Sequence, residues 1–328
     1  MLFAGISGSS TADAAGIGSL LIPQMKKQGF STSFSVAITA CSSVMGVIIP
    51  PSIMMVVWGG LMSVSIGGLF LAGVVPGVLI AASQMLAVYI YAKSNNYETT
   101  QRSNLKELFV ALIQAIPPLM TPVIIVGGIV GGVFTPTEAS AVAVVYSLLL
   151  GVIGYRTLNL SKVVKAFYEA GRFSAVSLFC VGTASAFGWL LAYYKVPLAI
   201  VEFLKPFGVG PVSTGLIIAG SFLFIGMFID AIPAIIILGT VLLPLAQYAG
   251  IHDIHFAIIG VVSLAFGLVS PPYGLCLMIS CAIGEIKIID ALRHVCFILI
   301  PMLLILLVII LLPDLLLYLP RWLMPRFM

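Results

Sequence analysis

Two stretches interrupt long apolar runs with consecutive prolines: VIIPPS at 47–52 and LVSPPYG at 268–274. Proline has no amide hydrogen and clashes with the preceding helical turn, so a Pro-Pro pair ends a helix and frees backbone carbonyls. Within a membrane, unwound backbone is tolerated only beside protein or a water-filled cavity. The two stretches therefore predict a pair of broken helices. A simple proline kink is the alternative interpretation.

Both stretches belong to an internal repeat. A shift of 221 residues places every Gly and Pro between residues 20 and 52 on a Gly or Pro of the later copy, without a gap. The pairs are Pro23 with Pro244, Gly29 with Gly250, Gly46 with Gly267, Pro50 with Pro271, and Pro51 with Pro272. Because Gly and Pro constrain the backbone, we expect the two copies to share one backbone path.

The composition indicates a polytopic membrane protein. Of the 328 residues, 61% are hydrophobic and only 8% are charged, whereas about 25% are charged in a typical soluble domain. This excludes a water-soluble enzyme and a nucleic-acid-binding protein. Apolar runs interrupted by Gly and Pro favour helices over alternating strands, so the predicted fold class is all-α.

The apolar runs have the lengths that membrane spans require. Predicted spanning helices lie at 66–92, 110–133, 138–155, 173–193 and 295–318, and the predicted broken spans lie at 31–62 and 255–283. Two further stretches, 1–24 and 208–249, each carry an Asp and are interpreted as re-entrant hairpins. The segment 161–172 has charged residues at helical spacing and predicts an amphipathic helix at the membrane surface.

The basic residues predict the orientation of the two copies. With both Asp segments as hairpins, 11 of the 15 Lys and Arg residues fall on one side, which the positive-inside rule assigns to the cytoplasm. No Lys or Arg occurs between 206 and 286, so the second copy enters from the opposite side. Inverted repeats with discontinuous helices are the architecture of secondary transporters.

Two small-residue segments carry the candidate ligands. GISGSSTADAAG at 5–16 offers hydroxyls and Asp13, and IGMFIDAIPA at 225–234 offers Asp230. The stretch 10–13 matches a capping box and Asp230 can be an N-cap, so both acids have a purely structural alternative. A carboxylate at mid-membrane costs roughly 2.5–3.5 kcal/mol on insertion scales. A bound cation would offset that cost.

Three other motifs have mainly structural interpretations. TPTE at 135–138 is a complete helix start. GGIVGG at 127–132 predicts close helix packing, with a hinge as the alternative. His252, Asp253 and His255 have no further metal ligand in view, and the sequence has no nucleotide-binding loop.

Taken together, GISGSSTADAAG, IIPPSIMMVVWG, GGVFTPTEASAVAVVY, GMFIDAIPAIIIL and SPPYGL resemble the large membrane subunit of the tripartite ATP-independent periplasmic (TRAP) transporters, the DctM-like family. The resemblance covers essentially the whole chain. It implies an elevator-type, sodium-coupled importer of organic acids with the architecture of the ion-transporter superfamily. A transport domain would comprise 1–92 and 206–318, a scaffold 93–205, and a C-terminal tail 319–328.

The resemblance also implies which residues bind each ligand. Two sodium sites would lie between each hairpin tip and the adjacent helix break, and the substrate would lie between the two tips. The implied sodium ligands are Ser7, Gly8, Ser9, Asp13, Gly46, Ile49, Pro50, Gly226, Asp230, Gly267, Ser270 and Pro271. The implied substrate contacts are Ser10, Thr11, Pro51, Ser52, Met227, Pro272 and Tyr273.

Partners and location follow from the same resemblance. A small DctQ-like membrane subunit, a periplasmic substrate-binding protein and the lipid bilayer would be the partners, in a bacterial inner membrane; nucleic acid would not be one. The organic acid could be a sialic acid, a dicarboxylate or a sugar acid. Family members have roughly a hundred more residues before GISGS, so we expect this chain alone to be inactive. A passive channel and an intramembrane enzyme are the rival functions, and the sequence lacks the convergent catalytic set that an enzyme requires.

Overall fold

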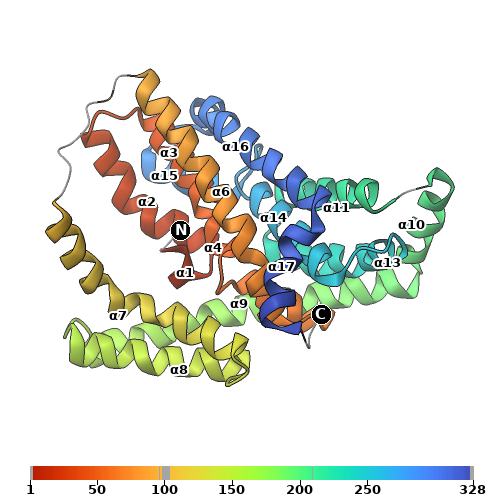
Figure 1. Ribbon diagram of the computed structural model, residues 1–328, viewed down its shortest axis with the longest axis horizontal. Helices are drawn as coiled ribbons and strands as arrows, with labels where there is room; N and C mark the ends of the chain where they lie inside the picture. Colours follow the sequence, from red (N-terminus) through yellow and green to blue (C-terminus); the bar gives the residue numbers. More distant parts are fainter. Residues whose placement is uncertain (1–2, 96, 98–103, 209, 326–328) are drawn as a thin grey trace.

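A computed structural model describes residues 3–95, 97, 104–208 and 210–325. Within these ranges every regular element is a helix and no strand occurs, which confirms the predicted fold class. Figure 1 shows the helices, with α14 at the centre and α7, α8 and α9 along the lower edge.

The first copy of the repeat forms six helices. They are α1 (Ala4–Ser7), α2 (Ser10–Lys27), α3 (Thr32–Ser43), α4 (Met45–Ile48), α5 (Ile53–Met62) and α6 (Ile66–Ser94). The break at Pro50 and Pro51 separates α4 from α5, and their peptide bond is cis. The bent pair around this break turns by 40°.

The central third of the chain forms long helices followed by short ones. They are α7 (Leu105–Val130), α8 (Pro136–Leu149), the π-helical turn η1 (Leu150–Gly154), α9 (Leu160–Tyr193), α10 (Val196–Leu204) and the 3₁₀ turn η2 (Lys205–Phe207). Thr135 caps α8 in a complete capping box with Glu138, and Pro136 is the first helical residue, as TPTE predicts.

The second copy forms the remaining helices. They are α11 (Pro211–Gly226), α12 (Ala231–Ala234), the π-helical turn η3 (Ile235–Gly239), α13 (Thr240–Tyr248), α14 (Asp253–Gly267), α15 (Leu275–Gly284) and α16 (Ile288–Leu311), followed by α17 (Pro313–Leu323).

Helix boundaries confirm the shared backbone path of the repeat. Shifted by 221 residues, α2 falls on the continuous helical segment Ala231–Tyr248, and the start of α3 falls on the start of α14. The turns between them match in detail. The Phe30 amide donates to the Met25 carbonyl at 3.0 Å, and the equivalent Ile251 amide donates to the Ala246 carbonyl at 2.9 Å. After the prolines the second copy has one extra residue, so α15 begins at Leu275 rather than at 274.

The two copies pack into each other. In α14, every residue after Asp253 is buried. Trp58 of α5 covers Gly260 of that helix, and its ring centroid lies 5.5 Å from that of Phe222 and 5.2 Å from that of Phe256. In the same way, α15 of the second copy packs against α2 and α3 of the first copy. Each broken helix is therefore enclosed partly by the other copy.

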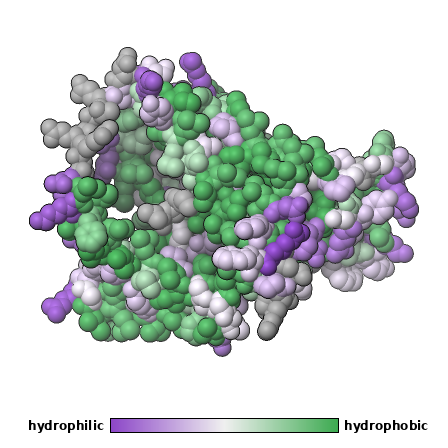
Figure 2. Space-filling model, in the orientation of Figure 1, coloured by the Kyte–Doolittle hydropathy of each residue, from purple (hydrophilic) through white to green (hydrophobic). Residues whose placement is uncertain are grey.

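Among the described residues, six helices are long and apolar enough to cross a membrane, or seven if the bent pair around Pro50 counts as one span. The six are Ile66–Ser94, Leu105–Val130, Pro136–Gly154, Leu160–Tyr193, Ala231–Tyr248 and Ile288–Leu311. Figure 2 shows the apolar surface of one face, with hydrophilic residues mainly at its edges. This surface suits contact with lipid.

Three expectations need correction. The amphipathic stretch 161–172 is not a separate helix, because it continues into the predicted span as the 34-residue α9. The last long span begins at Ile288 and ends at Leu311, and Leu312 separates it from α17. As a result, the predicted boundary between the transport domain (206–318) and the C-terminal tail (319–328) falls inside α17. Pro320 of this helix is buried.

The GGIVGG prediction of close helix packing is also wrong for the described residues. Gly131 caps the end of α7, and Gly132 adopts a φ of 69°, which favours glycine. A Cβ on Gly128 would meet Phe134 in the following turn, and one on Gly127 would meet nothing within 4 Å. The motif therefore ends a helix.

The central helices are much more exposed than the two repeats. Only Ile129 of α7, Ala139 and Ala143 of α8, and Ala184 of α9 are buried, and no residue of α10 is. These helices lie along the lower and right edges in Figure 1. The two repeats thus form the packed core of the described chain.

Candidate functional site

The first hairpin tip lies directly on the first helix break. Gly8 has a φ of 65°, and its carbonyl accepts a hydrogen bond from the Ile53 amide at 3.2 Å. A Cβ on Gly8 would lie 2.9 Å from the Pro51 carbonyl oxygen, and one on Gly5 would lie 3.6 Å from the Pro50 carbonyl oxygen. The tip therefore approaches the freed carbonyls of the break so closely that only a small residue fits at Gly8.

Asp13 lies close to this contact between the first tip and the first break. Its side chain is 1% exposed, and neither carboxylate oxygen has a hydrogen-bond partner among the described residues. A Cβ on Gly46 would lie 2.5 Å from Asp13 Oδ2 and 2.9 Å from the Ser9 carbonyl oxygen. The absence of a side chain at Gly46 thus lets two oxygen atoms of different residues pack closely against its backbone.

The capping-box interpretation of residues 10–13 is wrong. The N-cap of α2 is Ser9, whose side chain accepts a hydrogen bond from the Ala12 amide at 3.4 Å. Asp13 is the fourth residue of the helix and caps nothing. Its buried carboxylate lies in the first turn of α2, where the helix dipole favours a negative charge.

The second hairpin tip packs on the second break through a close backbone contact. A Cβ on Gly267 would lie 2.7 Å from the Cα of Gly226, and one on Gly226 would lie 3.0 Å from the Leu264 carbonyl oxygen. Both predicted residues, Gly226 and Gly267, are therefore in direct contact. They hold the end of α11 against the end of α14.

Asp230 differs from Asp13 in position and environment. It is exposed and occupies the N-cap position of α12, yet its side chain makes no capping hydrogen bond. The 221-residue shift places Asp230 on Ser9, the N-cap of α2, and places Asp13 on the buried Ala234. The two acids are therefore not equivalent, and the two sites are chemically distinct.

A cavity of about 230 Å³ lies between the two hairpin tips. Residues 8–11 line it from the first tip and residues 230–232 from the second. Its polar groups include the hydroxyls of Ser9, Ser10 and Thr11 and the carboxylate of Asp230, and the Ser9 and Thr11 hydroxyls lie 3.1 Å apart. Hydrogen-bonding groups from both copies of the repeat thus meet around one enclosed space.

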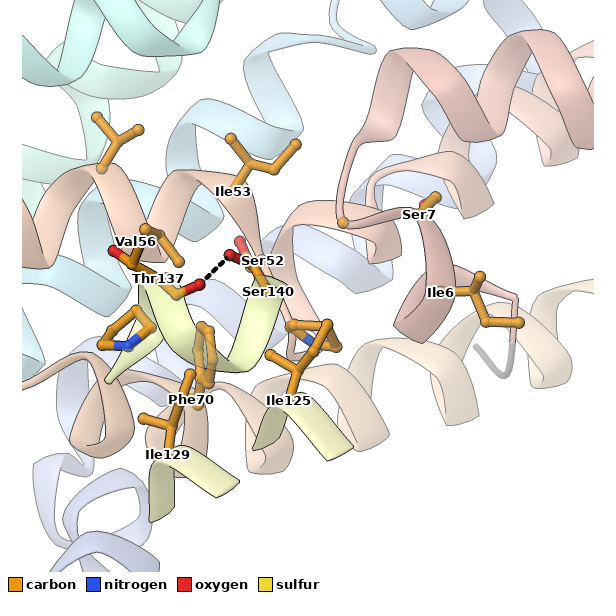
Figure 3. Close-up of a pocket in the computed structure, with 14 residues that line it drawn as sticks. Ile6, Ser7, Ser52, Ile53, Val56, Phe70, Ile125, Ile129, Thr137 and Ser140 are labelled. Carbon is orange, nitrogen blue, oxygen red and sulfur yellow. Dashed lines mark hydrogen bonds between the residues drawn. The ribbon is translucent and has the colours of Figure 1, made fainter. Parts of the chain in front are cut away.

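The predicted substrate contacts are divided among three cavities. Ser10 and Thr11 line the cavity between the tips. Pro51 and Ser52 line a second cavity of about 350 Å³, shown in Figure 3, which α7 and α8 close from the other side through Ile125, Ile129, Thr137 and Ser140. Pro272 lines a third, beside Ile286 and Lys287.

Tyr273 and Met227 line none of these three cavities. Tyr273 is 59% exposed and lies 6.2 Å from Phe228 between ring centroids. The structure therefore does not bring the whole predicted substrate set together.

Two predicted polar ligands close the breaks instead of pointing at a ligand. The Ser52 hydroxyl donates to the Val47 carbonyl at 2.6 Å and accepts from the Met55 amide at 3.3 Å. The Ser270 hydroxyl donates to the Phe266 carbonyl at 2.7 Å. Each hydroxyl satisfies a backbone group next to its prolines, as an interrupted helix in a membrane requires.

Ile49 and Pro50 lie at the first helix break, and Pro271 lies at the second. Ser7 lies beside the first tip. Its hydroxyl accepts from the Ser9 amide at 3.4 Å. His252 caps α14, and His255 Nε2 hydrogen-bonds with the Ile309 carbonyl at 2.9 Å. Within the described ranges no three His, Cys, Asp or Glu residues gather as a metal site.

Two residues with notable positions in the structure were not among the predicted site residues. Phe173 of α9 lines the cavity between the tips from outside both repeats. Gln84 of α6 is buried, and its amide donates to the Cys41 carbonyl at 2.7 Å, near the end of α3. Phe173 had no sequence signal, since only the fold brings it there. Gln84 did have a sequence signal, because it is the one Gln in the predicted span 66–92.

Two broken helices from repeat copies that meet around one cavity are typical of membrane transporters. The DctM component of the tripartite ATP-independent periplasmic transporter matches residues 1–315. The chain belongs to this family. It is accordingly a multi-pass protein of the bacterial inner membrane and a transporter component, not an enzyme.

Relatives in several bacteria support the assignment. The chain is 35% identical to the sialic acid TRAP transporter large permease protein SiaM of Vibrio cholerae, covering 98% of this chain and 75% of SiaM. It is 36% identical to the C4-dicarboxylate TRAP transporter large permease protein DctM of Pseudomonas aeruginosa, over 98% and 76%. It is 39% identical to the isethionate TRAP transporter permease protein DctMQ of Oleidesulfovibrio alaskensis, over 88% and 46%.

Proposed function

We propose that this chain is the ion- and substrate-carrying part of a sodium-coupled importer of an organic acid anion. The observation that carries the proposal is the cavity between the hairpin tips, where hydroxyls and a carboxylate from two repeat copies meet. Two helical segments, α2 and Ala231–Tyr248, begin at its wall. Helix N-termini attract anions, and unwound carbonyls attract cations.

The substrate class rests on the names of the relatives. Sialic acid, C4-dicarboxylates and isethionate are all small organic anions that bear a carboxylate or a sulfonate. Hydroxyl groups at a helix start, such as those of Ser10 and Thr11, suit oxyanions of this kind. Within the class, sialic acids, dicarboxylates and sugar acids are the candidates to test.

Sodium fits the first tip on structural grounds. The buried, unpartnered carboxylate of Asp13 and the neighbouring Ser9 carbonyl supply oxygen atoms, which are the ligands that hard cations prefer. An uncompensated buried carboxylate costs several kcal/mol, so a bound cation would stabilise the fold as well as the carrier. The second ion would lie near Asp230 and the Gly226–Gly267 contact.

Coupling to sodium also gives the import a driving force. An anion entering the cell moves against an inside-negative potential worth roughly 2.3 kcal/mol per charge per 100 mV. Co-transport of more sodium ions than substrate charges reverses that sign. Two sites, one at each tip, would supply at least two ions.

An elevator motion accounts for the division of the fold. The packed repeats would move as the transport domain, and the exposed helices of 93–205 would be the static scaffold. The copies would be inverted, as the distribution of basic residues indicates. Phe173 would be a scaffold residue, and the cavity would move past it during the elevator motion.

A chain of this family works within a three-component system, as its description as tripartite indicates. The DctMQ name combines two components, and this chain matches only 46% of that protein, which supports a second membrane component. We propose a small DctQ-like subunit and a periplasmic substrate-binding protein as partners.

Uptake into proteoliposomes tests the proposal. The complete transporter, with its small subunit and binding protein, is supplied with labelled sialic acid, succinate or gluconate under a sodium gradient. Saturable uptake of one substrate that disappears when potassium replaces sodium would support the proposal. Non-saturable flux without counterflow would indicate a passive channel and contradict it.

A further inference from the structure

A polar cavity of about 310 Å³ lies away from both hairpin tips, where the end of α6 meets the beginning of α16. Six residues line it: Tyr91, Ser94, Asn95, Arg293, His294 and Phe297. Neither the sodium sites nor the substrate cavity uses any of them. The cavity therefore needs a separate explanation.

Aromatic stacking builds a firm wall for this cavity. Tyr91 stacks on Phe34 with ring centroids 3.6 Å apart and planes 6° apart. His294 meets both rings edge-on, with its centroid 5.5 Å from that of Tyr91 and 5.8 Å from that of Phe34. The Tyr91 hydroxyl lies 3.1 Å from the Ser31 hydroxyl. These contacts fix the orientation of the His294 ring.

The lining carries positive charge and donors that the fold does not use. Arg293 is the charged residue among the six, and none of the described residues that line the cavity is a carboxylate. Within the described ranges the ion pair found is Arg321 with Asp314, so Arg293 has no carboxylate partner there. His294 also lines the cavity, but its Nδ1 is fully buried and does not face the cavity. The nearest acid on α16, Asp290, accepts the Lys287 amide at 3.2 Å.

The cavity lies near the beginning of a candidate membrane span, where lipid headgroups are expected. Arg293 lies five residues after Ile288, the first residue of a candidate span, which is about 7.5 Å along the helix axis. The headgroup layer of each leaflet is roughly 5–8 Å thick. Basic pockets between spanning helices at this depth bind anionic headgroups.

We propose that this cavity binds the phosphate of an anionic phospholipid, with Arg293 as its charged donor and His294, Ser94 and Asn95 as neutral hydrogen-bonding groups. A zwitterionic lipid is a poorer ligand, because the described lining residues offer a cationic side chain to the phosphate and no carboxylate to an ammonium group. The bound lipid joins α6 of the first repeat to α16 of the second. This proposal does not depend on sodium coupling or on the transported substrate.

Native mass spectrometry of the purified protein, released from nanodiscs of equal phosphatidylglycerol and phosphatidylcholine content, tests the proposal. We expect the wild type to retain one phosphatidylglycerol preferentially. Arg293→Gln should retain about tenfold less, because charge-assisted hydrogen bonds contribute about 1.5–3 kcal/mol. Arg293→Lys should retain an intermediate amount. The matched control is Arg172→Gln, which removes the same charge from an exposed site on α9 and should match the wild type.

Folding and the source of the phosphate are checked in parallel. Circular dichroism and gel filtration select variants that remain helical and monodisperse, and the Arg293→Lys arm keeps the comparison informative if Arg293→Gln fails to fold. Equal phosphatidylglycerol retention by wild type and Arg293→Gln would overturn the proposal. Equal retention of both lipids, or displacement of the lipid by 10 mM inorganic phosphate, would also overturn it.

Discussion

Asp13 is the residue where the local pattern and the fold differ. STAD predicts a helix start, and α2 does begin at Ser10, but the cap is one residue earlier, at Ser9. A one-residue difference in register moves a carboxylate from the helix end into the interior, where it is 1% exposed. The sequence was enough to identify Asp13 as unusual, because placing a carboxylate inside a membrane costs free energy. It could not show that the carboxylate lacks a partner, because that depends on α3 and α4.

Sodium should stabilise the protein through Asp13. We expect the melting temperature of the purified permease to rise by about 3–5 °C between choline and saturating sodium, since a ligand that binds only the folded state stabilises it. In Asp13→Asn the rise should be largely lost. The sodium-free melting temperature should be higher than that of the wild type, because an unpaired buried charge is gone.

Asp314→Asn is the control for this measurement, because Asp314 is exposed and pairs with Arg321 at 2.7 Å. It should keep the full sodium-dependent rise. A full rise in Asp13→Asn would show that the ion is held elsewhere.

At the scale of elements, the repeat could be predicted in more detail than any single site. The Gly and Pro pairs predicted both breaks and both intervening turns, because those residues restrict the backbone locally. The continuity of α9 and the true end of α7 at GGIVGG could not be predicted reliably. Helix continuation and helix packing depend on neighbours that the local pattern does not contain.

The contact between α11 and α14 should be intolerant of any side chain. Gly267→Ala would bring a Cβ to 2.7 Å from the Gly226 backbone, and overpacking of this kind costs about 1–3 kcal/mol. We expect a lower melting temperature and reduced folded yield.

Gly220→Ala is the matched control on α11, since a Cβ there meets nothing within 4 Å. It should be neutral or slightly stabilising, because alanine has the higher helix propensity. Equal stability of the two variants would mean that the Gly226–Gly267 contact is looser than described.

For the whole molecule, the cavity between the tips follows from packing across the two copies. The sequence indicated that the tips carry ligands, and residues 8–11 and 230–232 do line one space. It could not show that Pro51, Pro272 and Tyr273 lie outside this cavity, because their places depend on how α5 and α15 pack.

The proposed inversion of the two copies predicts opposite accessibility of two turns at comparable places in the repeat. Single cysteines placed at Lys26 and at Ala249, in a background without the native cysteines, should react with an impermeant maleimide from opposite sides of the membrane. Lys26 should label from the cytoplasm and Ala249 from the periplasm. Labelling of both positions from one side would show that the repeats are parallel.

Ligand protection of the cavity between the tips tests the central claim most directly. A single cysteine at Thr11 in the complete transporter is labelled with maleimide, with and without sodium and the transported anion. At ten times the dissociation constant we expect both together to slow labelling by about tenfold, while a cysteine at Ser140, in the neighbouring cavity, labels at an unchanged rate. Unchanged labelling at Thr11, or equal protection at Ser140, would contradict the assignment of this cavity as the transport site.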